Sequence, residues 1–150
     1  MRQRTVRCVE PVVALHGFAG TGETWTAVDP AAVAPDLPGH GTARLVEPTC
    51  ARCVEQVLAV APERFVLAGY SMGGRIALHV ALAAPERVSR LVVVSTTAGI
   101  HDDAERAVRR AADERLAGEF ERLPIEEVAE RWVSQPLFAR DPPAARALQR

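Results

Sequence analysis

The sequence predicts an α/β fold in which a doubly wound, mostly parallel sheet is followed by helices only. Between residue 5 and about residue 95, short apolar runs alternate with amphipathic stretches. The runs are continuous rather than alternating in polarity, which is typical of parallel strands covered on both faces. After Gly99 no further strand-like run is present. We therefore expect an α/β core in residues 1–99 and an incomplete helical cap in residues 100–150, without the last strands of such a sheet.

The core elements follow from the order of these runs. Pro35 is awkward in the second apolar run, residues 33–37, because proline cannot donate a hydrogen bond within a central strand. Residues 5–9 are a further candidate strand at the edge of the sheet. Residues 50–61 place their apolar side chains on one helical face. Residues 72–84 are apolar nearly all round, as in a helix buried against a sheet, and Pro85 ends it. The runs expected to form strands are 12–15, 33–37, 65–68 and 91–94.

Three helical patterns make up the predicted cap. Residues 101–122 are rich in Asp, Glu and Arg, and either Asp102 or Asp103 suits the N-terminus of that helix. A second helix is expected over residues 125–133, and Pro142 opens a third. Such a cap would lie over the carboxyl edge of the sheet, where sites in these folds are usually found.

The segment Gly69-Tyr70-Ser71-Met72-Gly73 carries the main chemical signal. It stands between a strand-like run and a helical pattern, as a nucleophile elbow does. In such a turn the serine lies on a strained corner with its oxygen exposed, and side chains at the glycine positions would collide with neighbouring backbone. The alternative is a turn of small residues without chemistry.

Composition excludes several classes of partner. The formal net charge is −1, which argues against nucleic acid or an anionic membrane as a partner bound through bulk charge. All 18 basic residues are arginine, so a local anion site would be built from guanidinium groups. There is no run of 18 apolar residues and no apolar signal core, so we expect a cytoplasmic protein. Cys50 and Cys53 lack a second ligand pair, so we expect ordinary helix cysteines and no metal.

These motifs resemble the α/β-hydrolase superfamily. His16-Gly17-Phe18 follows one strand, residues 36–41 read Asp-Leu-Pro-Gly-His-Gly after the next, and the elbow and cap come later. The arginine after the double glycine and the Trp132-x-x-Gln135-Pro136 element narrow the resemblance. The chain is similar to the 2-succinyl-6-hydroxy-2,4-cyclohexadiene-1-carboxylate synthases of menaquinone biosynthesis, from about residue 12 to residue 140.

The resemblance implies a function and a set of site residues. Enzymes of that family eliminate pyruvate from a carboxylate-bearing cyclohexene intermediate, without a cofactor, through a triad serine that acts in proton abstraction. The substrate would therefore be a small anion. The implied roles are catalysis for Ser71, oxyanion binding for the N–H groups of Phe18 and Met72, and substrate binding for Tyr70, Arg75, Arg109 and Trp132.

The residues themselves leave some of these roles open. Arg75 lies one turn after Ser71 on the same helical face, where a guanidinium can hold a carboxylate, but a solvated helix arginine is the alternative. Arg109 stands among other arginines and could simply pair with Glu105, Asp113 or Glu114. Trp132 and Tyr70 could equally be core residues. We treat His16 and His40, which follow strand ends, as structural.

The triad base and acid are not evident in this chain. Of the histidines after Ser71, His79 lies too far along the elbow helix, about 12 Å by helical rise, and His101 lacks a separate orienting carboxylate. We expect a fragment of such an enzyme, with a split enzyme and an inactive remnant as alternatives. The exposed sheet edge would seek a complementing C-terminal half or a second copy. A serine esterase or C–C hydrolase of the same fold is the other enzymatic hypothesis.

Overall fold

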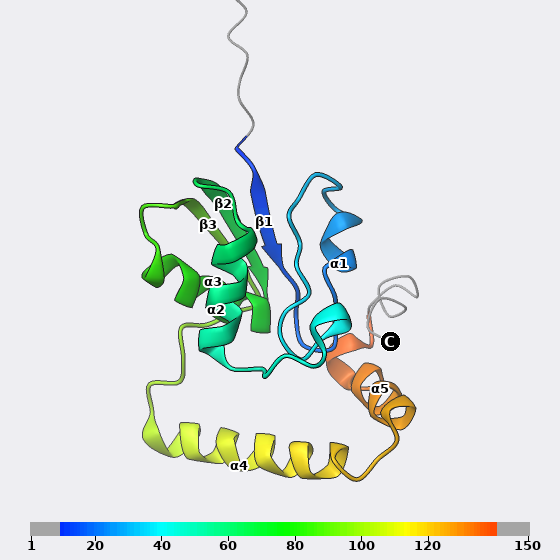
Figure 1. Ribbon diagram of the computed structural model, residues 1–150. Helices are drawn as coiled ribbons and strands as arrows, with labels where there is room; N and C mark the ends of the chain where they lie inside the picture. Colours follow the sequence, from blue (N-terminus) through cyan, green and yellow to red (C-terminus); the bar gives the residue numbers. More distant parts are fainter. Residues whose placement is uncertain (1–9, 141–150) are drawn as a thin grey trace, which may run out of the picture.

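A parallel sheet forms the centre of the molecule in the computed structural model, which describes residues 10–140 (Figure 1). Within that range the sheet has three strands in the order β1 (Val12–Leu15), β2 (Phe65–Tyr70) and β3 (Val88–Val94), and both pairs are parallel. Helices α2 (Cys50–Val60) and α3 (Met72–Ala83) pack against each other and α3 contacts every one of these strands. The predicted parallel α/β sheet is confirmed.

The predicted strand over residues 33–37 is wrong, because only one bridge forms there. Val33 donates its N–H to the Val12 carbonyl and accepts from the Ala14 N–H, at 2.8 and 2.9 Å. The next N–H that a parallel ladder would use belongs to residue 35. Pro35 has no N–H, so the pairing stops after one residue. The segment still runs beside β1 and delivers Asp36 to the loops below.

The core helices begin and end where their local sequence dictates. The Thr49 hydroxyl accepts from the Arg52 N–H at 3.2 Å and caps α2. Helix α3 ends one residue before Ala84-Pro85, since proline cannot continue a helix. As predicted, α3 packs against the sheet, but it buries one side only, and Leu82 on the other side is 81% exposed. The buried residues are Gly73, Gly74, Ile76, Ala77 and Val80.

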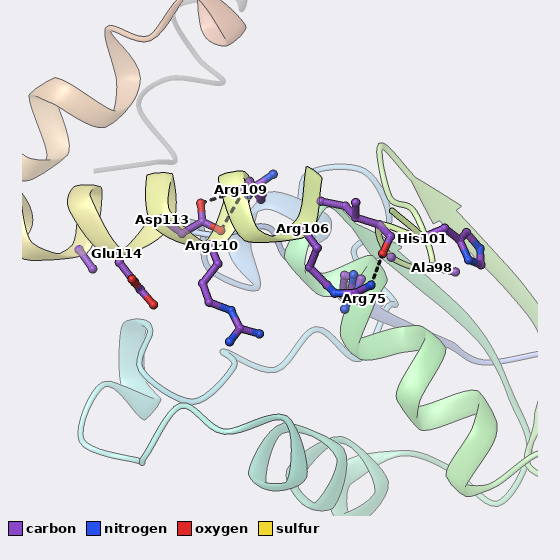
Figure 2. A pocket seen from close by; sticks show the side chains of 11 residues that line it. Arg75, Ala98, His101, Arg106, Arg109, Arg110, Asp113 and Glu114 are labelled. Atoms are coloured by element: carbon purple, nitrogen blue, oxygen red, sulfur yellow. Dashed lines mark hydrogen bonds and ion pairs between the residues drawn. The ribbon is translucent and has the colours of Figure 1, made fainter. Parts of the chain in front are cut away.

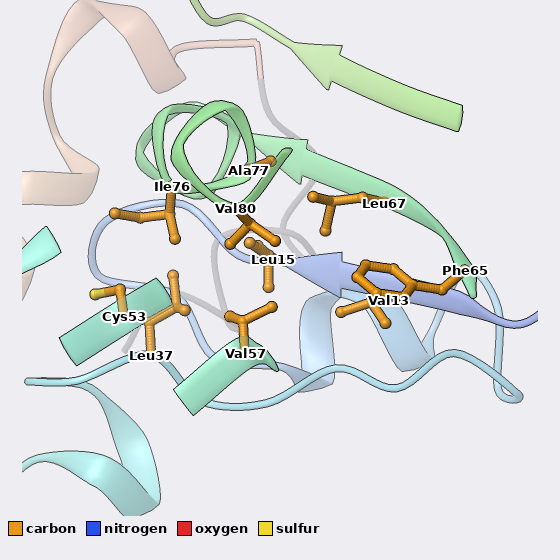
Figure 3. Packing of buried hydrophobic residues seen from close by; sticks show 10 residues of the cluster. All are labelled: Val13, Leu15, Leu37, Cys53, Val57, Phe65, Leu67, Ile76, Ala77 and Val80. Atoms are coloured by element: carbon orange, nitrogen blue, oxygen red, sulfur yellow. The ribbon is translucent and has the colours of Figure 1, made fainter. Parts of the chain in front are cut away.

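One hydrophobic cluster joins the sheet to α2 and α3 (Figure 3). Phe65, Leu15 and Leu67 are fully buried from the strands, and Val57 and Val80 meet them from the two helices. Burial of such side chains contributes about 1.5–3 kcal/mol each, which holds the elbow helix in place. The cluster consists of Val13, Leu15, Leu37, Cys53, Val57, Phe65, Leu67, Ile76, Ala77 and Val80.

The outer strand of the sheet is less well covered. Residues Leu91, Val92, Val93 and Val94 of β3 are 36–44% exposed. Within residues 10–140, β3 pairs only with β2. A continuous apolar run on a parallel strand is normally buried on both faces, so this part of β3 is an unpartnered apolar edge.

Two cap helices follow the sheet. Helix α4 (Asp103–Phe120) lies across the carboxyl ends of the strands, and α5 (Ile125–Val133) turns back beside the loop after β1 (Figure 1). The side chain of Asp102 accepts from the Glu105 N–H at 2.8 Å, so it is the cap of α4. The boundary at residue 99 stays a prediction. Residues 5–9 and the helix expected after Pro142 lie outside the described residues.

Three short helical elements were not predicted: α1 (Glu23–Thr26), η1 (Gly41–Ala43) and η2 (Pro136–Phe138). They are too short to leave a periodic signal in the sequence. Among residues 10–140, no helix has both the length and the apolar content needed to cross a membrane.

Candidate active site

Ser71 occupies a strained turn between β2 and α3, as the elbow motif predicts. Its backbone has φ 51° and ψ −113°, a conformation that a residue with a side chain adopts only when its surroundings enforce it. The Ser71 N–H donates to the Val94 carbonyl at 2.9 Å, and its carbonyl accepts from the Thr96 hydroxyl at 2.6 Å and the Arg75 N–H at 3.1 Å. The hydroxyl itself makes no hydrogen bond within residues 10–140.

The glycines around Ser71 are required by close backbone approach. A Cβ on Gly73 would overlap the carbonyl oxygens of Leu15 and His16, and one on Gly69 would lie 2.5 Å from the Gly73 carbonyl oxygen. Heavy atoms without a bond between them do not approach so closely. The elbow is therefore locked against the end of β1, which brings the loop after β1 beside the serine.

That loop contains the predicted oxyanion donor Phe18. Its neighbour Gly17 lies under the Tyr70 ring, where an added Cβ would be 2.8 Å from a ring carbon. Among the described residues, the N–H groups of Phe18 and Met72 have no acceptor. Two unpaired donors near a serine hydroxyl suit an oxyanion hole.

His16 holds the loop in place rather than serving as a base. It is fully buried, its Nδ1 lies 2.8 Å from the Gly17 carbonyl oxygen and its Nε2 accepts from the Leu37 N–H at 2.9 Å. Because a carbonyl can only accept, Nδ1 carries the proton. Burial lowers the pKa of His16 below its ordinary value, with a smaller contribution from His40, and outweighs the hydrogen bond to Gly17 that raises it. The imidazole is occupied by the fold, in line with the structural role that we expected.

Asp36 ties the same loop to the turn at η1. Its carboxylate accepts from the N–H groups of Gly22 and Thr42 and from the Thr42 hydroxyl, each at 2.8 Å. Burial alone would raise the pKa of Asp36, but these three hydrogen bonds together hold it below the ordinary value. Asp36 is thus an ionised structural anchor.

We predict that the free energy of unfolding falls as the pH drops below about 6.5. The unfolded chain binds a proton at His16 near that pH, whereas the native state resists it because its pKa is lowered, so the slope approaches 1.4 kcal/mol per pH unit. Urea denaturation between pH 7.5 and 5.5 measures this dependence of the free energy of unfolding on pH. His79→Gln, at an exposed histidine of α3, should keep the slope. An unchanged slope in His16→Gln would refute this explanation.

A pocket of about 770 Å³ lies between α4 and the elbow helix (Figure 2). Arg75 and Arg109, the two predicted carboxylate-binding residues, both line it. Ser71 is not among its lining residues; the backbone bond from Arg75 to the Ser71 carbonyl connects the two. Arg109 is also engaged within its own helix, because its Nε donates to both oxygens of Asp113 at 2.9 Å. The alternative that we considered for Arg109, a pair with Asp113, is therefore present.

Trp132 brings α5 into contact with the loop after β1. Its ring centroid lies 4.7 Å from that of Phe18 and 5.7 Å from that of Phe138, and Phe138 is buried. Phe18 in turn lies 5.6 Å from His40. Trp132 and Phe18, both predicted as site residues, are therefore in contact. Neither the spacing nor the periodicity of the sequence could reveal this contact.

We predict that Trp132→Ala loosens α5 from the core. The half-buried indole makes an edge-on ring contact with Phe18 and a tilted one with Phe138, so its loss should cost about 2 kcal/mol and raise amide hydrogen exchange in α5. Ile125→Ala is the matched control, because Ile125 is 72% exposed on the same helix. Equal exchange rates in the two variants would contradict the prediction.

The comparison with protein families decides the fold family. Residues 12–150 match the model described as the alpha/beta hydrolase family. The chain belongs to the α/β-hydrolase family. The strand order and the strained turn at Ser71 agree with that assignment.

Several relatives of this α/β-hydrolase have names. The chain is 36% identical over 138 residues to the 2-succinyl-6-hydroxy-2,4-cyclohexadiene-1-carboxylate synthase of Enterobacter sp. and 33% identical to that of Citrobacter koseri, with 85% of the chain covered in each. It is also similar to MenH from S. aureus, with a TM-score of 0.76, 27% identity and 95% of the chain covered. The chain spans 54%, 55% and 62% of these three proteins, respectively.

The pocket contains two arginines that the sequence did not single out, Arg106 and Arg110, together with the predicted ones. His101, considered above only as a triad base, lines it as well. The spacing of Arg106, Arg109, Arg110 and Asp113 by three or four residues was the available signal, since it places them along one side of a helix. Within residues 10–140 no cluster of His, Cys, Asp or Glu could hold a metal ion, and Cys50 and Cys53 are free thiols on α2.

Proposed function

We propose that this chain is the serine-bearing part of a lyase of menaquinone biosynthesis that eliminates pyruvate from a carboxylate-bearing cyclohexene intermediate. The observation that carries the proposal is Arg75, which follows Ser71 by one turn and lines an arginine-rich pocket under the cap. A guanidinium there suits a carboxylate better than a neutral ester. The names of the relatives support the same reaction.

The expected product carries two carboxylates, which suits a pocket lined by several arginines. A 2-succinyl-cyclohexadiene-1-carboxylate carries one carboxylate on its ring and a second at the end of the succinyl chain. In this proposal Arg75 and Arg109 bind substrate carboxylates, and Tyr70 and Trp132 contribute the apolar walls that the ring needs. Arg109 would have to exchange Asp113 for the substrate. No cofactor takes part.

The proposed chemistry is a proton transfer rather than an acyl transfer. The Ser71 oxygen, deprotonated by a base, accepts a proton from the substrate, and the electron pair left behind forms a ring double bond. The C–O bond to the pyruvate unit breaks at the same time, and the departing enolate takes a proton to become pyruvate. The N–H groups of Phe18 and Met72 would stabilise the negative oxygen that develops beside them.

We propose that the activating base and its acid come from a polypeptide equivalent to the rest of the named relatives, which packs on the exposed edge of β3. The apolar residues Leu91–Val94, and the side of β3 that pairs with no strand within residues 10–140, support this docking. A second copy of the chain at the same edge is the alternative occupant.

A fluorophosphonate probe tests this arrangement, because it reacts only with an activated serine. The chain would be mixed with the remaining C-terminal part of the Enterobacter relative, and Ser71→Ala serves as the control. We expect Ser71 to be labelled in the mixture and not in the chain alone. Labelling of the chain alone would place the base within these 150 residues. Sedimentation of the chain alone would detect the alternative, a dimer formed through β3.

An esterase or C–C hydrolase is the second candidate, because the strained turn at Ser71 is equally suited to acyl transfer. A screen of p-nitrophenyl esters separates the two functions. Robust ester turnover that survives Arg75→Ala would favour the hydrolase. A chain that is neither labelled nor active in the mixture would be a non-catalytic remnant.

A further inference from the structure

The arginines that line the pocket differ in how their charges are compensated. Arg106 pairs with Asp103 and donates to the Ile100 carbonyl at 2.7 Å. Arg109 pairs with Asp113. Within residues 10–140, Arg75 and Arg110 form no ion pair and no side-chain hydrogen bond. Two of the four cations are therefore free to receive a ligand without losing a partner.

Arg110 extends from the cap side of the pocket. In Figure 2 its side chain reaches away from the α4 backbone into the open space, whereas Arg109 turns along the helix toward Asp113. Arg75 lies on the opposite element, α3, next to the loop at Gly99. The two unpaired guanidinium groups thus belong to two elements that meet around one cavity of about 770 Å³.

We propose that Arg110 is a third carboxylate-binding residue beside Arg75 and Arg109, and that the unpaired Arg110 and Arg75 hold the two carboxylates of one ligand while Arg109 stays paired with Asp113. The ligand class, a ring carrying two carboxylates, rests on the proposed function. A guanidinium without a partner gains the full energy of a charge-assisted, bidentate bond, whereas Arg109 must first give up Asp113. Arg110 therefore selects dianions over monoanions.

Glu114 is the one carboxylate on the pocket wall without an ion pair within residues 10–140. It lies one turn from Arg110 and would repel an incoming anion. Removing its charge should strengthen dianion binding, which is the opposite of what removing the Arg110 charge should do. The two changes on one helix thus give a test with two signs.

The test measures binding by calorimetry to the 150-residue chain, with three probes of matched shape. 2-Succinylbenzoate carries both carboxylates, 4-oxo-4-phenylbutanoate lacks the ring carboxylate, and 2-acetylbenzoate lacks the succinyl one. We expect Arg110→Gln to weaken binding of the dicarboxylate and of one of the two monocarboxylates by about tenfold. Arg75→Gln should weaken binding of the dicarboxylate and of the other monocarboxylate to the same extent. Glu114→Gln should tighten the dicarboxylate about threefold.

Arg115→Gln is the matched control, because Arg115 is exposed on α4 and does not line the pocket. Its affinity for all probes should equal that of the wild type. The inference is overturned if Arg110→Gln weakens the dicarboxylate no more than Arg115→Gln does, or if the wild type binds no dicarboxylate. Binding that depends on Arg75 but not on Arg110 leaves the proposed function intact. If binding needs both arginines but the chain joined to the C-terminal part of the Enterobacter relative releases no pyruvate, only the proposed function is refuted, and the inference about Arg110 stands.

Discussion

Replacing Gly73 with alanine should destabilise the chain strongly. The new Cβ would overlap the backbone carbonyl oxygens of Leu15 and His16 at the end of β1, and neither can move without breaking the sheet. We expect a loss of about 4 kcal/mol, which is a large part of the stability of a domain of this size. Thermal denaturation followed by circular dichroism measures the change.

Gly118→Ala is the control for this substitution. Gly118 lies within α4, where an added Cβ meets nothing closer than an Arg122 side-chain nitrogen at 3.9 Å. Alanine there should stabilise the chain by about 0.5–1 kcal/mol, since it is the better helix former. A Gly73→Ala variant as stable as the wild type would mean that the elbow is not packed against β1.

Replacing Arg75 with glutamine should lower kcat/KM for the carboxylate-bearing substrate by about 100-fold, or about 2.7 kcal/mol. The guanidinium is the cation nearest to Ser71 along α3, and a neutral amide of similar size removes its charge without leaving a hole. The measurement uses the chain joined to the C-terminal part of the Enterobacter relative, with pyruvate release as the readout.

Arg75→Lys separates charge from geometry. Lysine keeps the positive charge but cannot form the forked, bidentate bond, so it should recover about tenfold of the lost activity. Turnover of a neutral p-nitrophenyl ester should change less than about threefold in either variant, because its bonds do not involve the carboxylate site. Equal losses on ester and carboxylate would show that Arg75 supports the fold rather than the substrate.

The sequence predicted most where local physics decides the structure. The elbow at Ser71, the proline that ends α3, the Asp102 cap of α4 and the bounds of α5 all depend on residues close together in the chain. The prediction of a strand over residues 33–37 was wrong because we gave its apolar pattern more weight than the single N–H that Pro35 lacks.

The candidate site depended more on tertiary structure. Motif and resemblance were enough to propose Ser71 and Arg75, but the contact of Trp132 with Phe18 joins residues more than 100 positions apart. The pairing of Arg109 with Asp113, and the absence of such a pair at Arg110 within the described residues, depends on side-chain directions that an arginine-rich helix does not reveal by spacing.

Pyruvate release from the enolpyruvyl cyclohexene intermediate tests the central claim most directly. The chain joined to the C-terminal part of the Enterobacter relative would be assayed with lactate dehydrogenase and NADH, beside its Ser71→Ala variant. We predict release with kcat/KM above about 10⁴ M⁻¹s⁻¹ and a loss of at least about 1000-fold in Ser71→Ala. Ester hydrolysis without pyruvate release, or pyruvate release that survives Ser71→Ala, would contradict the account.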